Sequence, residues 1–318
     1  MLFRSEKIRE AGKILDEHGI RVSIEGTGFF KIPLPPDTPE GQKKLDAQWA
    51  LLTTAMERAK AFGTDRIRVF TFMLAKGETK DEKSLGRVWE LTREAGKILD
   101  EHGIRVSIEG TGFFKIPLPS ETAEGQKKLD AQWALLTAAM ERAKAFGTDK
   151  IRVFTFMLAK DETKNEKAYA RIWELTREAA RRAKGFRLAV ENIGGGYVST
   201  GAEAALLFKN VKEDNIGLTW DPNNAGESGE QSFPEGYRKL DPARVFHVHL
   251  RDYKHQDGKV VWTRVGDGEF DNLGQIRALL KDGYKGTFTL ETHWRDPKGK
   301  TYSSEQSLKA LLDVIAKV

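Results

Sequence analysis

The sequence contains no cysteine, and it has no run of about 18 apolar residues that could cross a membrane. The first absence excludes disulfides, a thiolate nucleophile and cysteine metal ligands, and it fits a reducing compartment. Residues 1–11 are charged where a signal peptide would need an apolar core. We therefore expect a cytoplasmic protein without a membrane partner.

A strong excess of one charge is also missing. The 52 lysines and arginines are nearly balanced by 47 aspartates and glutamates, which gives a net charge of +5. The densest basic stretch, residues 177–184, is typical of one exposed helix face rather than of a nucleic-acid surface. The charge pattern therefore predicts no nucleic-acid partner.

What the chain does have is an internal repeat. Residues 9–92 recur as residues 93–176, with 73 identities over 84 positions. Such similarity indicates either a recent duplication or one made deliberately in a laboratory, and we favour the deliberate one. Most of the differences share one loop or one helix, as if one module had been refitted to two sets of neighbours: Pro36/Ser120, Asp37/Glu121, Pro39/Ala123, Ser84/Ala168, Leu85/Tyr169, Gly86/Ala170 and Val88/Ile172.

Each copy of the repeat reads as β-α-β-α. Residues 20–25 alternate around β-branched side chains, and residues 66–73 form a second run of this kind. Residues 42–62 and 82–102 carry apolar side chains three and four apart, which predicts amphipathic helices, and each run ends at a glycine. The two copies therefore supply four strands and four helices.

The alternation continues to the end of the chain, with strand-like runs at residues 186–192, 216–221, 245–250 and 287–292. Eight parallel strands separated by helices predict an α/β fold, a (β/α)8 TIM barrel. We expect a single domain over residues 1–318, in which residues 9–92 and 93–176 are the copies and residues 177–318 form the remaining half. Residues 6–18 and 303–318 both predict a helix, and only one fits between the eighth and first strands. The other helix either caps the bottom of the barrel, is unpacked, or contacts a neighbouring molecule. Both a monomer and a homodimer are therefore compatible with the sequence.

Polar side chains stand at the predicted carboxyl ends of the last four strands. They are Glu191, Asp221, His249 and Glu291. Strand ends of this kind meet at the mouth of a barrel. Three carboxylates and one imidazole suit a single divalent metal such as Mn²⁺, Co²⁺, Mg²⁺ or Zn²⁺, with positions left for substrate oxygens. The alternative is that each of the four is simply hydrogen-bonded at its strand end.

Residues 186–318 resemble the xylose-isomerase-like TIM barrels, most closely sugar-phosphate isomerases and epimerases of the tagatose-epimerase and inosose-pathway type. The resemblance rests on Val-Glu-Asn, Trp-Asp-Pro-Asn-Asn, His-Val-His-Leu-Arg-Asp, Gly-Asp-Gly-Glu-Phe-Asp and Leu-Glu-Thr. It implies one metal held by the four residues above and a small sugar or sugar phosphate as substrate. It also implies that Glu191 and Glu291 serve as base and acid in proton transfer beside a carbonyl.

Further side chains are expected near the substrate. His247 lies on the same face as His249 and is an alternative ligand, although we prefer His249 for its place nearer the mouth. His293 is expected either to reach the substrate or to lie in solvent, and the other candidates for substrate binding are Trp220, Asn224 and Arg251. Related abasic-site endonucleases have a histidine where Asn224 stands. Their multi-metal cluster therefore cannot be assembled here.

The repeat is the main departure from the family pattern, because it replaces the first two strands. Aligning the strands puts Glu25 and Glu109 in the place that Glu191 has on its own strand. One possibility is that Glu25 and Glu109 add carboxylates to the mouth, as part of the substrate site. The other is that they turn outward into their loops. Two functions remain: a metal-dependent sugar or sugar-phosphate isomerase or epimerase, or an engineered duplicated barrel made to test fold assembly, with little or no activity.

Overall fold

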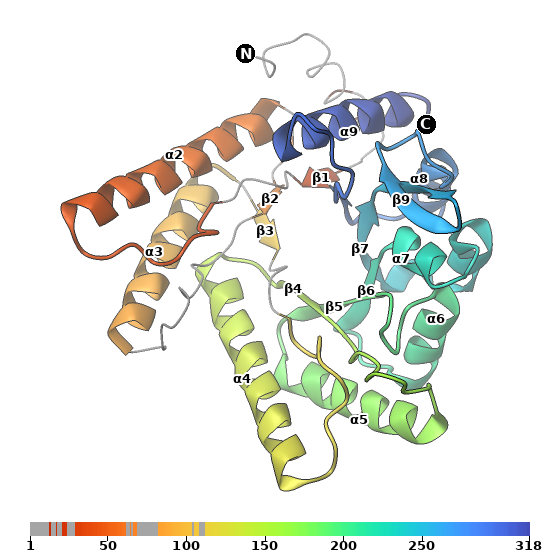
Figure 1. The fold of residues 1–318 in the computed structure, drawn as a ribbon. Helices are drawn as coiled ribbons and strands as arrows, with labels where there is room; N and C mark the ends of the chain where they lie inside the picture. The colour runs from red at the N-terminus through yellow and green to blue at the C-terminus, as the bar shows by residue number, and fades with distance from the viewer. Residues whose placement is uncertain are drawn as a thin grey trace.

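The computed structural model describes residues 13, 17, 21–23, 29–61, 64, 66–68, 82–103, 105–107 and 112–318. Strands surround a central axis and helices form the outer layer (Figure 1). The barrel strands are β1 (Arg21–Ser23), β2 (Arg66–Arg68), β3 (Arg105–Ser107), β4 (Lys150–Val153), β5 (Arg187–Glu191), β6 (Ile216–Trp220), β7 (Val245–Leu250) and β10 (Thr287–Leu290).

These strands pair in parallel. One sheet has the order β1-β10-β7-β6-β5-β4, and β2 pairs with β3. Since β1 lies beside β2 and β3 lies beside β4, the two groups close into one barrel. The predicted TIM barrel and its eight strands are confirmed. The strands alternate between side chains that face the barrel axis and side chains that face the helices.

The outer layer consists of helices, and those of the repeat lie close to the predicted ranges. They are α2 (Pro39–Ala61), α3 (Glu82–Glu101), α4 (Ala123–Ala145), α5 (Glu166–Arg182), α6 (Gly201–Asn210), α7 (Pro222–Glu227), α8 (Asn272–Lys281) and α9 (Lys300–Ile315). Short helical segments at Ser232–Gly236, Tyr237–Lys239 and Pro242–Arg244 connect α7 to β7. Side-chain caps fix several starts; the Thr200 hydroxyl, for example, accepts the N–H of Glu203, whose carboxylate accepts the Thr200 N–H in return.

The structure adds a hairpin that the sequence analysis did not predict. It consists of β8 (Asp252–Gln256) and β9 (Lys259–Thr263), which pair antiparallel after β7. The turn residues Asp257 and Gly258 both have positive φ angles, of 52° and 70°. An Asp-Gly turn of this kind is the usual signal of a two-residue hairpin. The predicted helix at residues 6–18 falls outside the described residues except for Lys13 and Glu17, whereas the predicted C-terminal helix is α9, which lies against α8.

The described parts of the two copies pack alike. Phe29 stacks on Phe30 and Phe113 stacks on Phe114, each pair with ring centres 3.9 Å apart. Where the copies differ, the second is adapted to the non-repeated half. Tyr169 stands where the first copy has Leu85, and its hydroxyl donates to the backbone carbonyl of Tyr197 in the loop after β5.

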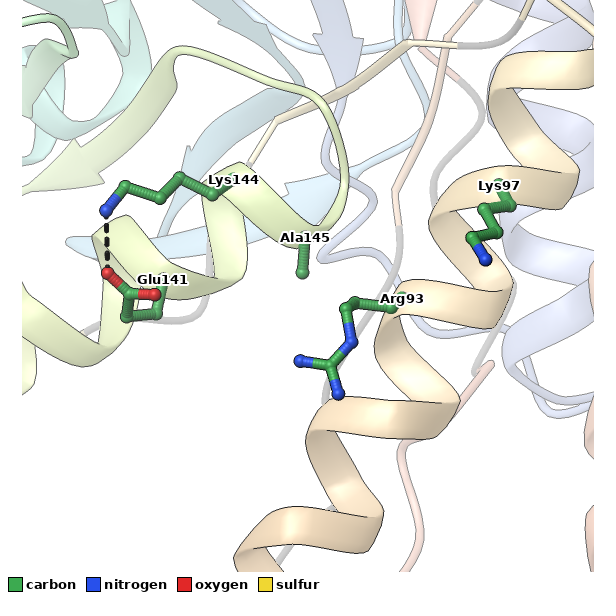
Figure 2. Close-up of a pocket in the computed structure, with 5 residues that line it drawn as sticks. All are labelled: Arg93, Lys97, Glu141, Lys144 and Ala145. Atoms are coloured by element: carbon green, nitrogen blue, oxygen red, sulfur yellow. Dashed lines mark hydrogen bonds and ion pairs between the residues drawn. The ribbon is translucent and has the colours of Figure 1, made fainter.

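Helices α3 and α4 cross closely at Gly96. A Cβ atom on this glycine would lie 2.1 Å from the carbonyl oxygen of Ala145, so the crossing requires glycine. Beside it lies a cavity of about 420 Å³, lined by Arg93 and Lys97 from α3 and by Glu141, Lys144 and Ala145 from α4 (Figure 2). Lys144 is paired with Glu141 at 2.8 Å. The cavity belongs to the outer helix layer and not to the strand ends.

Candidate metal centre

The four predicted ligands meet at the carboxyl ends of their strands. Glu191 is the last residue of β5, Asp221 follows β6, His249 lies in β7 and Glu291 follows β10. Each offers one ligand atom, and these atoms lie within 4.8 Å of one another. The Nδ1 atom of His249 is 3.5 Å from Oε1 of Glu191, 3.6 Å from Oδ2 of Asp221 and 3.6 Å from Oε2 of Glu291.

This Nδ1 atom is buried, and within the described part of the chain it has no hydrogen-bond partner. An unpaired buried polar atom is costly, so it calls for an explanation. The separations of 3.5 and 3.6 Å are too long for a good hydrogen bond. They are close to the ligand–ligand separation around a tetrahedral ion with bonds of about 2.1 Å. The four residues therefore fit a divalent cation.

Asp221 is held by contacts on both of its oxygens. Oδ1 accepts the backbone N–H groups of Asn223 and Asn224, both at 3.0 Å, and so caps α7. Oδ2 accepts a hydrogen bond of 2.7 Å from Arg251. Burial acts to raise the pKa of Asp221, but Arg251, His249 and the Asn224 N–H outweigh it and lower the pKa to about 2. Asp221 is therefore a carboxylate at neutral pH.

Glu191 and His249 are also electrostatically coupled. Burial acts to raise the pKa of Glu191, but the Arg152 guanidinium beside it lowers the pKa overall. For His249, burial acts to lower the pKa, but Glu291, Asp221 and Glu191 together hold it well above its usual value. A metal ion and a proton would therefore compete for this imidazole.

Arg251 connects the candidate ligands to the mouth of the barrel. Its buried guanidinium donates to Oδ1 of Asn224 at 2.6 Å and to Nδ1 of His293 at 2.6 Å. Its charge is compensated by Asp221, and the Trp262 ring of the β8–β9 hairpin packs against it, 4.4 Å away. Asn224 in turn donates to the backbone carbonyl of Asn192 at 2.8 Å. The predicted residues Asn224, Arg251 and His293 thus form one connected group beside Asp221.

Other predicted residues lie elsewhere. The Nε2 atom of His247 is 2.8 Å from the hydroxyl of Thr289, and His247 is not among the four clustered residues. The assignment of Trp220 to the substrate is wrong. Its side chain is fully buried and its indole N–H donates to Gln275 of α8, because alternation along β6 turns it toward the helices. Glu25 and Glu109 lie outside the described residues.

Sequence reasoning missed Arg152 on β4 and Asn192 after β5. Arg152 donates to Oε2 of Glu191 at 2.7 Å. Asn192 accepts the N–H of Asp221 at 2.8 Å and donates to its carbonyl, also at 2.8 Å, so it fixes the backbone that carries this candidate ligand. The alternation of side chains along β4 could have placed Arg152 inside the barrel, but not its pairing with Glu191.

The fold is a TIM barrel of the α/β class, and this cluster is a candidate metal centre at its strand ends. The family model described as xylose isomerase-like TIM barrel matches residues 2–125 and 111–318. The chain belongs to this family. A comparison with proteins of curated function gave no match.

Solved structures share the fold at low sequence identity. The IOLI protein with a binding zinc atom is 17% identical, with 94% of this chain and 99% of that chain covered and a TM-score of 0.64. A D-psicose 3-epimerase with D-tagatose from Clostridium cellulolyticum H10 is 17% identical, with coverage of 94% and 99% and a TM-score of 0.63. A xylose isomerase-like protein from Mycobacterium smegmatis in complex with magnesium is 20% identical, with coverage of 94% and 98% and a TM-score of 0.62. At these identities the likeness shows the fold. Among the described residues, no helix is long and apolar enough to span a membrane.

Proposed function

We propose that this protein is a divalent-metal-dependent isomerase or epimerase of a small sugar or sugar phosphate. The observation that carries the proposal is the buried Nδ1 atom of His249, which faces three carboxylate oxygens at 3.5 to 3.6 Å. The family and the epimerases among the structural neighbours support the same reading.

Glu191, Asp221, His249 and Glu291 would hold the ion. When bound, a divalent ion polarises a substrate carbonyl and so makes the adjacent C–H more acidic. Carboxylates and imidazole bind Mn²⁺, Co²⁺, Mg²⁺ and Zn²⁺, so the proposal covers all four ions. His249 must be neutral to coordinate, so binding of the ion releases the proton that the surrounding carboxylates favour.

The proton transfer falls to Glu191 and Glu291. They come from β5 and β10, the strands on either side of β6 and β7, so they approach the cluster from two sides. One carboxylate removes the proton beside the carbonyl and the other, protonated, returns one to the opposite face. The lowered pKa of Glu191 keeps it ionised, which is the form that can accept a proton. Arg251 donates to His293 at 2.6 Å and so holds its imidazole at the mouth, where the half-buried ring can orient a substrate oxygen.

Thermal stability of metal-free protein tests the metal centre. A cation that binds only the folded state should raise the melting temperature by about 5 °C at a hundredfold excess over its Kd. We expect the rise with at least one of Mn²⁺, Co²⁺, Zn²⁺ and Mg²⁺, and its loss in His249→Ala. The matched control is His255→Ala, because His255 is an exposed histidine paired with Glu269 on the hairpin. No rise in the unmutated protein would refute the centre.

Catalysis is tested separately, by incubating ketoses and ketose phosphates with loaded protein in D₂O. Proton exchange beside the carbonyl introduces deuterium, which NMR detects even when little product accumulates. We expect incorporation with the unmutated protein and none with Glu291→Gln.

The second candidate is an engineered duplicated barrel whose metal centre does no chemistry. It is favoured by the 73 identities over 84 positions between the copies. This candidate predicts a metal-dependent melting shift without deuterium incorporation from any ketose. The two experiments together therefore separate the two functions.

A further inference from the structure

The two oxygens of Glu191 have different partners. Oε1 lies 3.5 Å from the Nδ1 atom of His249 and faces the candidate metal centre. Oε2 accepts a hydrogen bond of 2.7 Å from the Nη1 atom of Arg152. A carboxylate engaged in this way on one oxygen offers the other alone to a cation.

The barrel geometry fixes this arrangement. In the pairing of β4 with β5, Arg152 is opposite Ala189, and Ala189 shares its barrel face with Glu191 two residues later. The side chains of Arg152 and Glu191 are only 13% and 6% exposed. The guanidinium carbon of Arg152 lies 5.4 Å from the ring centre of Phe154, which directly follows β4. Packing therefore limits the orientations that the ion pair can adopt.

Arg251 makes a contrasting contact on the other side of the cluster. It donates to Oδ2 of Asp221, the same oxygen that lies 3.6 Å from Nδ1 of His249. Arg251 thus touches the metal-facing oxygen of its carboxylate, whereas Arg152 touches the oxygen that is turned away from His249. The two arginines offset two of the three carboxylate charges, Arg251 at the metal-facing oxygen of Asp221 and Arg152 at the other oxygen of Glu191.

We propose that Arg152 is a positioning residue, which restricts Glu191 to a single coordinating oxygen and sets how much negative charge the centre presents to the cation. This inference rests on the proposed metal-dependent function. If Arg152 loses its charge, the centre carries one more uncompensated negative charge and Oε2 becomes free to coordinate. Both changes strengthen cation binding. The same freedom moves Glu191 from the orientation needed for proton transfer, so turnover falls.

The test is titration of metal-free protein with Mn²⁺ by calorimetry. Arg152→Gln, which keeps a hydrogen-bond donor without the charge, should bind Mn²⁺ about tenfold more tightly than the unmutated protein. Arg152→Lys, which restores the charge, should return the Kd to within about twofold. In active protein, Arg152→Gln should also lower kcat with little change in KM. A merely structural role would weaken binding or leave it unchanged.

The chain supplies a matched control in its first copy. Arg68 occupies on β2 the position that Arg152 has on β4, within the same Ile-Arg-Val-Phe-Thr-Phe sequence. Arg68→Gln removes the same charge from a strand that does not pair with β5, and should leave the Mn²⁺ Kd within about twofold. Equal tightening in both variants would overturn the proposal, because it would show an effect of total charge alone.

The remaining outcomes are also decisive. If the unmutated protein binds no Mn²⁺ or other divalent ion, the proposed function and the role of Arg152 fail together. If it binds Mn²⁺ and Arg152→Gln binds no more tightly, only the role of Arg152 fails. Should Arg152→Gln not fold, Arg152→Met takes its place, since its apolar chain can pack against Phe154. Failure of both variants to fold would assign Arg152 a structural role and refute the proposal.

Discussion

The guanidinium group of Arg251 lies against the indole ring of Trp262, with 4.4 Å between the guanidinium carbon and the ring centre. Trp262 also meets the ring of His293 edge-on, with centres 4.7 Å apart. The β8–β9 hairpin therefore reaches back to the strand ends, where Trp262 packs against Arg251 and against His293, which we propose contacts the substrate. The hairpin contributes no residue to the four-residue cluster, but it helps to form the mouth through Trp262.

Replacing Trp262 by leucine should raise the KM for substrate without changing metal affinity. A cation–π contact of this kind contributes about 0.5–2 kcal/mol, which corresponds to a rise in KM of about 2- to 30-fold. Steady-state kinetics and Mn²⁺ titration measure the two effects. Val261→Ala is the control, because Val261 is the neighbouring residue and is exposed. A loss of Mn²⁺ affinity in Trp262→Leu as large as the rise in KM would contradict the prediction that Trp262 affects substrate binding alone.

Acid should destabilise the metal-free protein partly through Asp221. Its pKa of about 2 in the folded protein lies below the ordinary value of 3.8. The carboxylate therefore stabilises the fold fully above about pH 4, and this contribution, about 2 kcal/mol, is lost as the pH falls toward 2. Asp221→Asn should be less stable at pH 7, because Arg251 loses the carboxylate that compensates its charge, but its stability should fall less between pH 4 and 2. Urea unfolding at each pH in EDTA measures this, and parallel pH curves would contradict it.

Two glycines in α3 should respond oppositely to alanine. Gly96 has the carbonyl oxygen of Ala145 2.1 Å from the position of its missing Cβ, so Gly96→Ala must push α3 and α4 apart and should cost about 1–3 kcal/mol. Gly86 has open space around it, and the second copy has Ala170 at the same place. Gly86→Ala should therefore stabilise the protein by about 0.5–1 kcal/mol. Urea unfolding of the two variants measures both changes in stability. Equal changes would show that the close approach of α3 to α4 does not determine the effect of Gly96→Ala.

The barrel and the four clustered residues could be predicted because both follow from local patterns. Alternating and three-to-four spacings define the strands and helices, and in a barrel every strand end meets at one mouth. Glu191, Asp221, His249 and Glu291 needed no knowledge of pairing beyond this. Their convergence within 4.8 Å is a consequence of the topology.

What the sequence left hidden depends on tertiary contacts. Trp220 precedes Asp221 at the mouth, yet one step along a strand turns a side chain to the other face, and Gln275 of α8 receives its indole N–H. His247 and His249 share a face, and only the neighbouring Thr289 shows which one is already engaged. Likewise, no sequence spacing relates Arg152 to Glu191, because their contact depends on the register of β4 against β5.

All four candidate ligands come from β5, β6, β7 and β10, which are neighbours in one sheet, whereas β1 to β4 belong to the copied residues. Backbone pairing among the four ligand-bearing strands sets the spacing of the cluster without the copied half. The copied half can therefore differ in the side chains that it presents at the mouth while the candidate ligands keep their spacing. Arg152 on β4 contacts the candidate ligand Glu191 directly, so a change at this position in the copied half would affect the cluster. Exchange of the copied half should therefore leave the four candidate ligands in place, provided that the arginine that contacts Glu191 is kept.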